Sequence, residues 1–198
     1  MLKKDDYILN KSIGVTTHRR IDFAYRTAKK LDTLYQANWT LFNQAGIPYQ
    51  EWQHEDILDF TTDAIVAERL GWTAAPTKSL FLKIKGGGYC LLLTHRDNRL
   101  NSKQMKQAIG KRVSVCSDEE MIEQIHCVPG AVCPFALPQH ITLLVDPDIY
   151  NYQEIMFTPG KPDHTFAFAT EQLPLLLGQL NNPVVLLTPD KSESITTL

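Results

Sequence analysis

The sequence lacks the local motifs that identify most nucleotide-binding proteins and hydrolases. It contains no Walker-type phosphate loop, no G-x-G-x-x-G, no G-x-S-x-G nucleophile elbow and no H-E-x-x-H zinc motif. It also lacks an apolar run long enough to cross a bilayer, and we expect neither a leader segment at its start nor a membrane partner. Any chemistry must therefore come from residues that the fold brings together.

Cysteine is scarce as well, because the 198 residues include four cysteines and no C-x-x-C pair. A secreted disulfide scaffold is therefore not indicated, and we expect a reducing, cytoplasmic environment. His126, Cys127 and Cys133 could hold a metal, but their spacing is unlike the usual zinc patterns. Cys133 could also act as a nucleophile, although the sequence ties no histidine or acid to it. We predict that these thiols are buried, with no metal and no cofactor.

Charge is unevenly distributed along the chain. The net charge of −2 argues against a protein that coats nucleic acid unselectively. Between Lys78 and Arg112, however, there are nine basic residues and one acidic residue, Asp97. Such a segment is most often a solvated face, but it is also what a local phosphate-binding surface requires.

The composition is that of a globular protein, with 43% hydrophobic and 21% charged residues. The length suits one domain with extensions. We assign residues 1–35 to an N-terminal extension that is partly helical, residues 36–182 to the domain, and residues 183–198 to a disordered tail.

Apolar spacing and turn residues predict a mixture of helices and strands. In residues 20–45 the apolar positions lie three and four apart, which predicts a long helix that ends at Gly46. Strand-like runs lie at 49–54, 79–84, 89–94, 113–116, 141–146, 154–158 and 164–169. Later helices start at residues that can cap them: Thr61 or Thr62, Asn101 or Ser102, Ser117 (with Glu120 as a capping box), and Thr170.

The connections between strands decide the fold class. The glycine turn at residues 86–88 joins two strand-like runs into a hairpin, and other turns are also too short for a crossover helix. We therefore predict an α+β fold with a mixed, largely antiparallel, barrel-like sheet flanked by helices.

The most informative stretch is the loop at residues 125–137, I-H-C-V-P-G-A-V-C-P-F-A-L. Pro129 and Pro134 each fix φ at about −65° and lack an N–H, whereas Gly130 can take a positive φ at little cost. A loop built in this way is stiff, and its backbone amides can point at a bound molecule. On its own it indicates a loop for a small ligand or an anion.

Taken in order, the motifs resemble those of the YbaK/prolyl-tRNA synthetase-associated editing domains. The sequence carries Y-x-x-W-x-H, P-T-K-S-L-F-L-K, a glycine turn, L-L-L-T-x-x-x-N-R-L, G-K-R-V-S-V, S-D-E-E and P-G-A-V-C-P-F. The resemblance covers residues 36–180, and K-S-L-F-L and G-x-x-x-P-F are its most specific parts. It implies an enzyme that hydrolyses mischarged aminoacyl-tRNA, most often tRNA for proline carrying alanine or cysteine. Prolyl-tRNA synthetase is a further candidate partner.

The resemblance also implies roles for the matching residues. Lys78 corresponds to the family's essential lysine, which contacts a phosphate near the 3′-terminal adenosine. The residues from Gly130 to Pro134 correspond to a loop whose backbone amides hold the aminoacyl carbonyl, with no metal. Alanine-specific members often have a histidine where this sequence has F-T-P-G-K, whereas cysteine-type members tend to have a small hydroxyl residue and a glycine, so Thr158 and Gly160 slightly favour cysteine as the amino acid removed. The predicted site residues are Lys78 and Gly130 as catalytic groups, with His54, Ser79, Ala131, Val132, Cys133, Pro134, Thr158 and Gly160 as substrate-binding residues.

Two other functions remain open. A non-catalytic protein with the same fold could use the basic segment to hold tRNA or a synthetase, in which case binding would weaken with salt. A hydrolase that depends on a metal or on Cys127 and Cys133 is the third interpretation.

Overall fold

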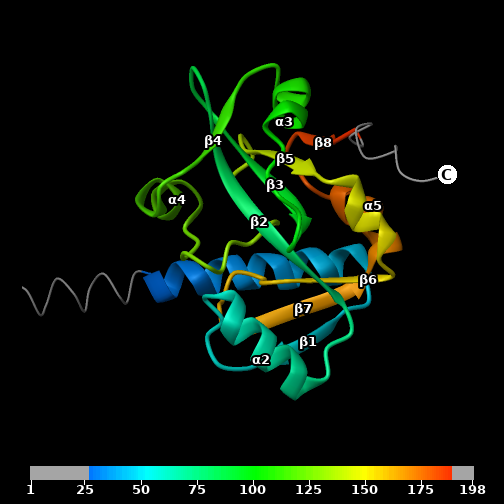
Figure 1. Ribbon diagram of the computed structural model, residues 1–198. Coiled ribbons are helices and arrows are strands. Elements are labelled where there is room, and N and C mark those ends of the chain that lie inside the picture. Colours follow the sequence, from blue (N-terminus) through cyan, green and yellow to red (C-terminus); the bar gives the residue numbers. More distant parts are fainter. Residues whose placement is uncertain (1–26, 189–198) are drawn as a thin grey trace, which may run out of the picture.

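A computed structural model of the chain describes residues 27–188 (Figure 1). Its first element is a helix described from residue 27 to 45, inside the range that the apolar spacing predicts. The predictions for residues 1–26 and 189–198 lie outside the described part. The other elements, in chain order, are β1 (Gln50–Gln53), α2 (Phe60–Leu70), β2 (Ala75–Ile84), β3 (Tyr89–His95), α3 (Ser102–Ile109), β4 (Val113–Val115), α4 (Asp118–Ile125), β5 (Thr142–Val145), η1 (Pro147–Asn151), β6 (Glu154–Phe157), β7 (His164–Ala169), η2 (Thr170–Gln172), α5 (Leu173–Gly178) and β8 (Val184–Leu186). Within residues 27–188, no helix is long and apolar enough to cross a membrane.

The strands form one mixed sheet in the order β1-β7-β6-β2-β3-β5-β8, with β4 paired to β2. The pairs β1 with β7, β6 with β7, β2 with β3, and β2 with β4 are antiparallel. The pairs β2 with β6, β3 with β5, and β5 with β8 are parallel. Figure 1 shows α3, α4 and α5 around the upper part of the sheet and α2 at its lower end. The predicted α+β class, with a mostly antiparallel sheet flanked by helices, is confirmed.

Strand β2 joins the two halves of this sheet and leaves part of one edge open. One edge pairs with β3 over most of its length. On the other edge, Ala75 and Pro76 pair with β6, and residues 82–84 pair with β4. The Phe81 carbonyl also accepts a hydrogen bond from the Cys116 amide (3.0 Å). Residues 77–80 between these contacts therefore have no strand partner on that edge within the described chain.

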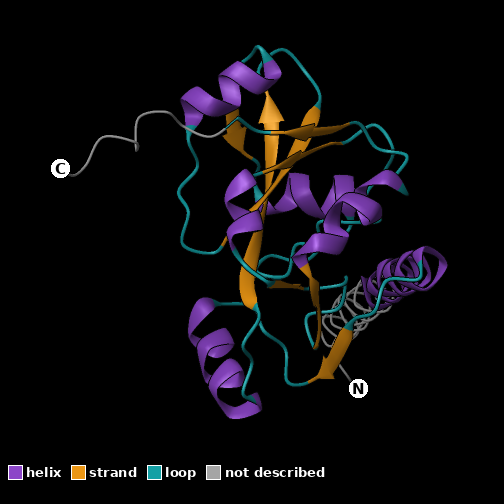
Figure 2. Ribbon diagram, turned by 90° about the vertical axis from the view of Figure 1, so that its right-hand side faces the viewer, coloured by secondary structure: helices purple, strands orange, loops and turns teal. Residues whose placement is uncertain are grey.

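The helix at residues 27–45 supplies the centre of the main hydrophobic core, and Figure 2 views it nearly end-on beside the strands. Phe42 is fully buried, with its ring 5.1 Å from that of Phe168 and 5.8 Å from that of Phe166. Leu34 belongs to the same core. The helix continues without a break through residue 35. Residues 27–35, which the sequence assigns to an extension, therefore pack as part of the domain.

Phe42→Ala is expected to lower the free energy of unfolding by about 3–5 kcal/mol, because it leaves a cavity among buried rings. Five aromatic side chains surround Phe42 and cannot all close on the space. Urea denaturation measures the loss. Trp39→Ala on the same helix is the control, since Trp39 is 44% exposed. Equal losses in the two variants would contradict the central position of Phe42.

Two of the predicted helix starts are wrong. The N-cap of α2 is Asp59, whose carboxylate accepts hydrogen bonds from the Thr61 and Thr62 amides (2.9 Å each). The threonines are thus capped by an upstream residue rather than capping the helix themselves. Thr170 forms no side-chain cap; it opens the short η2, and α5 after it ends at Gly178. By contrast, Asn101 and Ser117 cap α3 and α4 as predicted.

The predicted tail begins too early. Residues 184–186 form β8, which pairs in parallel with β5, and Leu187 is buried. This apolar run follows the turn N-N-P, so the sequence carries a strand signal that the assignment of residues 183–198 to a tail overlooked. The packed domain therefore extends through residue 187.

Candidate active site

A pocket of about 330 Å³ lies over the open edge of β2. Its walls come from β2, the ends of β4 and β6, the start of α4, the loop around Gly130, and the segment that leads into α2. Five of the predicted site residues line it: Lys78, Ser79, Gly130, Val132 and Thr158. The fold thus brings the predicted lysine and the predicted glycine loop, which lie far apart in the sequence, into one cavity.

Lys78 enters the pocket from the open stretch of β2, beside Ser79. Burial lowers the pKa of Lys78 below its ordinary value, and the negative charge of Asp97 opposes this shift. Among the described residues, no carboxylate forms an ion pair with the Lys78 ammonium. A partly desolvated ammonium without such a partner is stabilised when an anion binds. Lys78 is therefore suited to hold a phosphate group.

The loop at Gly130 needs glycine for two independent reasons. Its φ of +84° lies in the left-handed region, which side chains disfavour. A Cβ atom there would also lie 2.6 Å from the Leu58 carbonyl carbon and closer still to its oxygen. The loop is tightened by a hydrogen bond from the Ala131 amide to the Val128 carbonyl (3.0 Å). Within the described chain the amides of Gly130 and Val132 form no hydrogen bond, so both can serve as donors to a ligand.

The other residues of the predicted loop are packed beneath the pocket-lining part of the loop. Ala131, Cys133 and Pro134 are buried and do not line the pocket. The Cys133 thiol lies 3.1 Å from the Asn38 Nδ2 and 3.2 Å from the Phe135 carbonyl oxygen. The amide of Ala131 is already used within the turn, as described above. These three residues therefore shape the loop, and their side chains lie outside the pocket lining.

The thiols are poorly suited to nucleophilic attack. Burial raises the pKa of Cys127 to about 11 and that of Cys133 further. Cys116 does line the pocket, but burial raises its pKa to about 11 as well. Each thiol therefore stays protonated near neutral pH, and the thiolate is the reactive form. Among residues 27–188, no three histidine, cysteine or acidic side chains gather into a group that could hold a metal ion.

Thr158 and Gly160, predicted as neighbours in the site, have different positions. Thr158 lines the pocket just beyond β6. Gly160 faces the helix at residues 27–45, where an added Cβ would lie 2.6 Å from the Leu34 Cβ and 2.8 Å from the Tyr35 nitrogen. Gly160 thus allows the helix to approach the sheet closely, and it does not line the pocket.

His54 lies behind the pocket wall rather than in it. Its Nε2 is 3.0 Å from the Thr165 hydroxyl, and its Nδ1 is 2.7 Å from the Glu55 carbonyl oxygen. Its ring also packs edge-on against Trp72, with ring centroids 5.4 Å apart. Thr165 and Trp72 both line the pocket. His54 is therefore placed to orient the Thr165 hydroxyl.

Sequence reasoning missed several lining residues, among them Asp63, Trp72, Arg96 and Thr165. Arg96 was counted in the basic segment, but nothing distinguished it from the other eight basic residues. Asp63 lies in the first turn of α2, where an acidic residue is expected from the helix dipole alone. Thr165 lies within the apolar strand β7, and the sequence gives no sign that it faces a pocket.

Together, the fold and the pocket define an α+β domain with one cavity between a lysine and a stiff glycine loop, an arrangement suited to an anionic ligand. The model of the aminoacyl-tRNA editing domain family matches residues 60–175, more than half of the chain. The chain belongs to this family. The predicted family and the class of enzyme, aminoacyl-tRNA deacylase, are confirmed.

Three comparisons illustrate the relationship. The multifunctional Ser/Thr-tRNA deacylase ProXp-y of Escherichia coli (strain K12) is 28% identical over 135 residues, which cover 66% of this chain and 80% of that protein. The uncharacterized protein YwhH of Bacillus subtilis (strain 168) is 23% identical over 131 residues, 63% of this chain and 83% of that one. The crystal structure of a candidate trans-editing enzyme for prolyl-tRNA synthetase has a TM-score of 0.62 at 20% identity, over 79% of this chain and 97% of that one, which shows a shared fold.

Proposed function

We propose that the protein hydrolyses the ester of a mischarged tRNA for proline, with Lys78 on a phosphate of the tRNA 3′ end and the Gly130 loop on the aminoacyl carbonyl. The observation that supports this proposal is the shared pocket, in which Lys78 and Gly130 both line one cavity. Mischarged tRNA occurs where translation takes place, so a cytoplasmic location accompanies the proposal.

The proposed reaction uses backbone donors instead of a side-chain nucleophile. Water attacks the ester carbonyl, and the tetrahedral oxyanion that forms accepts hydrogen bonds from the Gly130 and Val132 amides. A neighbouring ribose hydroxyl can orient the water. The intermediate then releases the ribose oxygen, which takes up a proton as the free amino acid leaves. Each pre-aimed donor of this type can lower the barrier by about 3–4 kcal/mol.

A separate enzyme that removes wrong amino acids is useful because the active site of a synthetase cannot strongly reject an amino acid that is smaller than its cognate one. A missing methylene changes binding by only about 1–3 kcal/mol. Alanine and cysteine are the amino acids that the sequence resemblance implies, and the name of ProXp-y adds serine and threonine. The hydroxyl groups of Thr158 and Thr165 in the pocket lining are compatible with any of these small side chains.

A panel of mischarged tRNAs tests the proposal. tRNA for proline carrying alanine, cysteine, serine or threonine is incubated with the purified protein, as is correctly charged prolyl-tRNA, and loss of the ester is measured. We expect at least one mischarged tRNA to be deacylated, and we expect tRNA for proline that carries proline not to be hydrolysed. If the protein binds tRNA but cleaves none of these esters, the alternative of a non-catalytic tRNA- or synthetase-binding protein replaces the proposal.

A further inference from the structure

The pocket contains a second cation that the proposed mechanism does not use. Lys78 and Arg96 are the basic side chains that line the cavity in the described part of the chain. Arg96 directly follows β3, and its amide donates a hydrogen bond to the Pro76 carbonyl (3.0 Å), which continues the ladder between β2 and β3. The base of the side chain is thus fixed to the same strand that carries Lys78.

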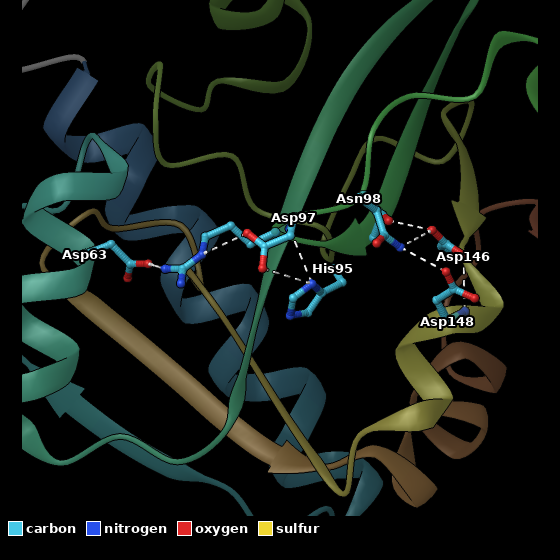
Figure 3. Close-up of polar contacts among 8 residues, drawn as sticks. Asp63, His95, Asp97, Asn98, Asp146 and Asp148 are labelled. Carbon is cyan, nitrogen blue, oxygen red and sulfur yellow. Dashed lines mark hydrogen bonds and ion pairs between the residues drawn. The ribbon is translucent and has the colours of Figure 1, made fainter.

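The Arg96 guanidinium is held at the pocket by an ion pair. Its Nη1 lies 2.5 Å from the Oδ2 of Asp63, in the first turn of α2, and its Nε lies 3.9 Å from the Asp97 Oδ1 (Figure 3). The Arg96 and Asp63 side chains are 28% and 17% exposed, so the pair is partly buried and its geometry is restrained. A guanidinium carries five N–H donors, and these two contacts leave donors for a further acceptor.

These features fit a phosphate more closely than they fit a purely structural ion pair. A guanidinium presents a planar fork that matches two phosphate oxygens, whereas Lys78 supplies a compact charge. The carboxylate of Asp63 fixes the direction of the fork and, as an anion, cannot itself bind the phosphate. Asp97 is 78% exposed, so its attraction for Arg96 is screened by solvent.

We propose that Arg96 is a second phosphate ligand for the 3′ end of the bound tRNA, and that Asp63 is a positioning residue that holds its guanidinium at the pocket. The inference rests on the proposed function, because it takes the ligand to be RNA. Two cations that line one pocket would hold the single-stranded end at two points and thereby fix the ester relative to the Gly130 loop.

The test counts phosphate contacts by the salt dependence of binding. Uncharged tRNA for proline is titrated into the wild-type protein and into Arg96→Gln at several salt concentrations. Loss of one phosphate contact on a single strand reduces the slope of log K against log salt by about 0.7. We expect that reduction in Arg96→Gln, together with affinity weakened about 10- to 100-fold. An unchanged slope would overturn the proposal.

Two further variants distinguish a phosphate-binding role of Arg96 from a purely structural role in its ion pair with Asp63. Asp63→Asn breaks the same ion pair but leaves the guanidinium, so it should keep the wild-type slope. If Arg96 only fastened α2 to the sheet, Asp63→Asn and Arg96→Gln would have equal effects, and the proposal would be wrong. Arg96→Lys retains the charge without the fork and should restore the slope but not the full affinity. Thermal unfolding of each variant verifies that it is folded.

Arg69→Gln is the matched control. Arg69, on α2, likewise pairs with a carboxylate, that of Glu55, but it does not line the pocket. We expect its slope to equal that of the wild type. The measurement uses uncharged tRNA, so it remains valid if no ester in the panel is cleaved. Failure of the proposed function and failure of the role of Arg96 are therefore distinguishable.

Discussion

Lys78→Ala is expected to lower kcat/KM for deacylation of the best mischarged tRNA by about 100-fold or more. In the proposed mechanism, the variant removes a charge-assisted contact to a phosphate in a partly desolvated pocket, where such contacts are stronger than at an exposed surface. On the same proposal, the phosphate would then face the negative charge of Asp97, which acts on Lys78 in the wild-type protein, without a compensating ammonium. Single-turnover hydrolysis of the ester measures the loss.

Lys83→Ala is the matched control, because Lys83 lies on the same strand but outside the pocket lining. It pairs with Glu120, and its side chain is 51% exposed. We expect its activity to stay within about twofold of the wild type, since exposed pairs contribute little. Lys78→Arg should recover part of the activity, because it keeps the charge but not the compact shape. Full activity in Lys78→Ala would refute the proposed mechanism.

The parts of the fold that the sequence predicted depend on local interactions. The caps of α3 and α4 use side chains that reach amides two or three residues further along, as Asn101 and Ser117 do. The hairpin of β2 and β3 follows from two apolar runs around a glycine turn. The start of α2 was missed because Asp59, Thr61 and Thr62 can all cap a helix, and tertiary contacts choose among them. The Ile57 amide donates to the Pro162 carbonyl (2.9 Å), which fixes the chain just before Asp59.

Residues of the candidate site could be predicted from the sequence only where they belong to a recognisable motif. The order of motifs predicts Lys78 and Gly130, and both line one pocket; their catalytic roles stay a prediction. Gly160 lies outside the pocket lining because it packs against Leu34, on a helix that begins outside the resemblance. Arg96 and Asp63 meet across the fold, from the end of β3 and the start of α2. Their positions in the sequence give no sign that these two side chains form an ion pair.

Gly130→Ala is the second variant with a large expected effect, because an added methyl group meets the backbone of Leu58 rather than a side chain that can move aside. Relief requires the loop to shift away from the segment before α2, which in the proposed mechanism moves the Gly130 amide away from the oxyanion. Loss of one such donor lowers kcat by about 100- to 1,000-fold. Rapid-quench measurement of kcat with saturating mischarged tRNA tests this expectation, and KM should change less than kcat.

Gly88→Ala isolates the steric part of this effect. Gly88, in the hairpin turn, has a φ of +88°, close to the +84° of Gly130, but an added Cβ would find its nearest atom at 3.9 Å. Both variants carry a similar backbone strain, of order 1–3 kcal/mol, which urea denaturation can compare. Only Gly130→Ala should also lose catalysis, because only there does relief of the clash displace an amide in the pocket. Similar kcat values for the two alanine variants would show that the close approach to Leu58 does not position the catalytic donor.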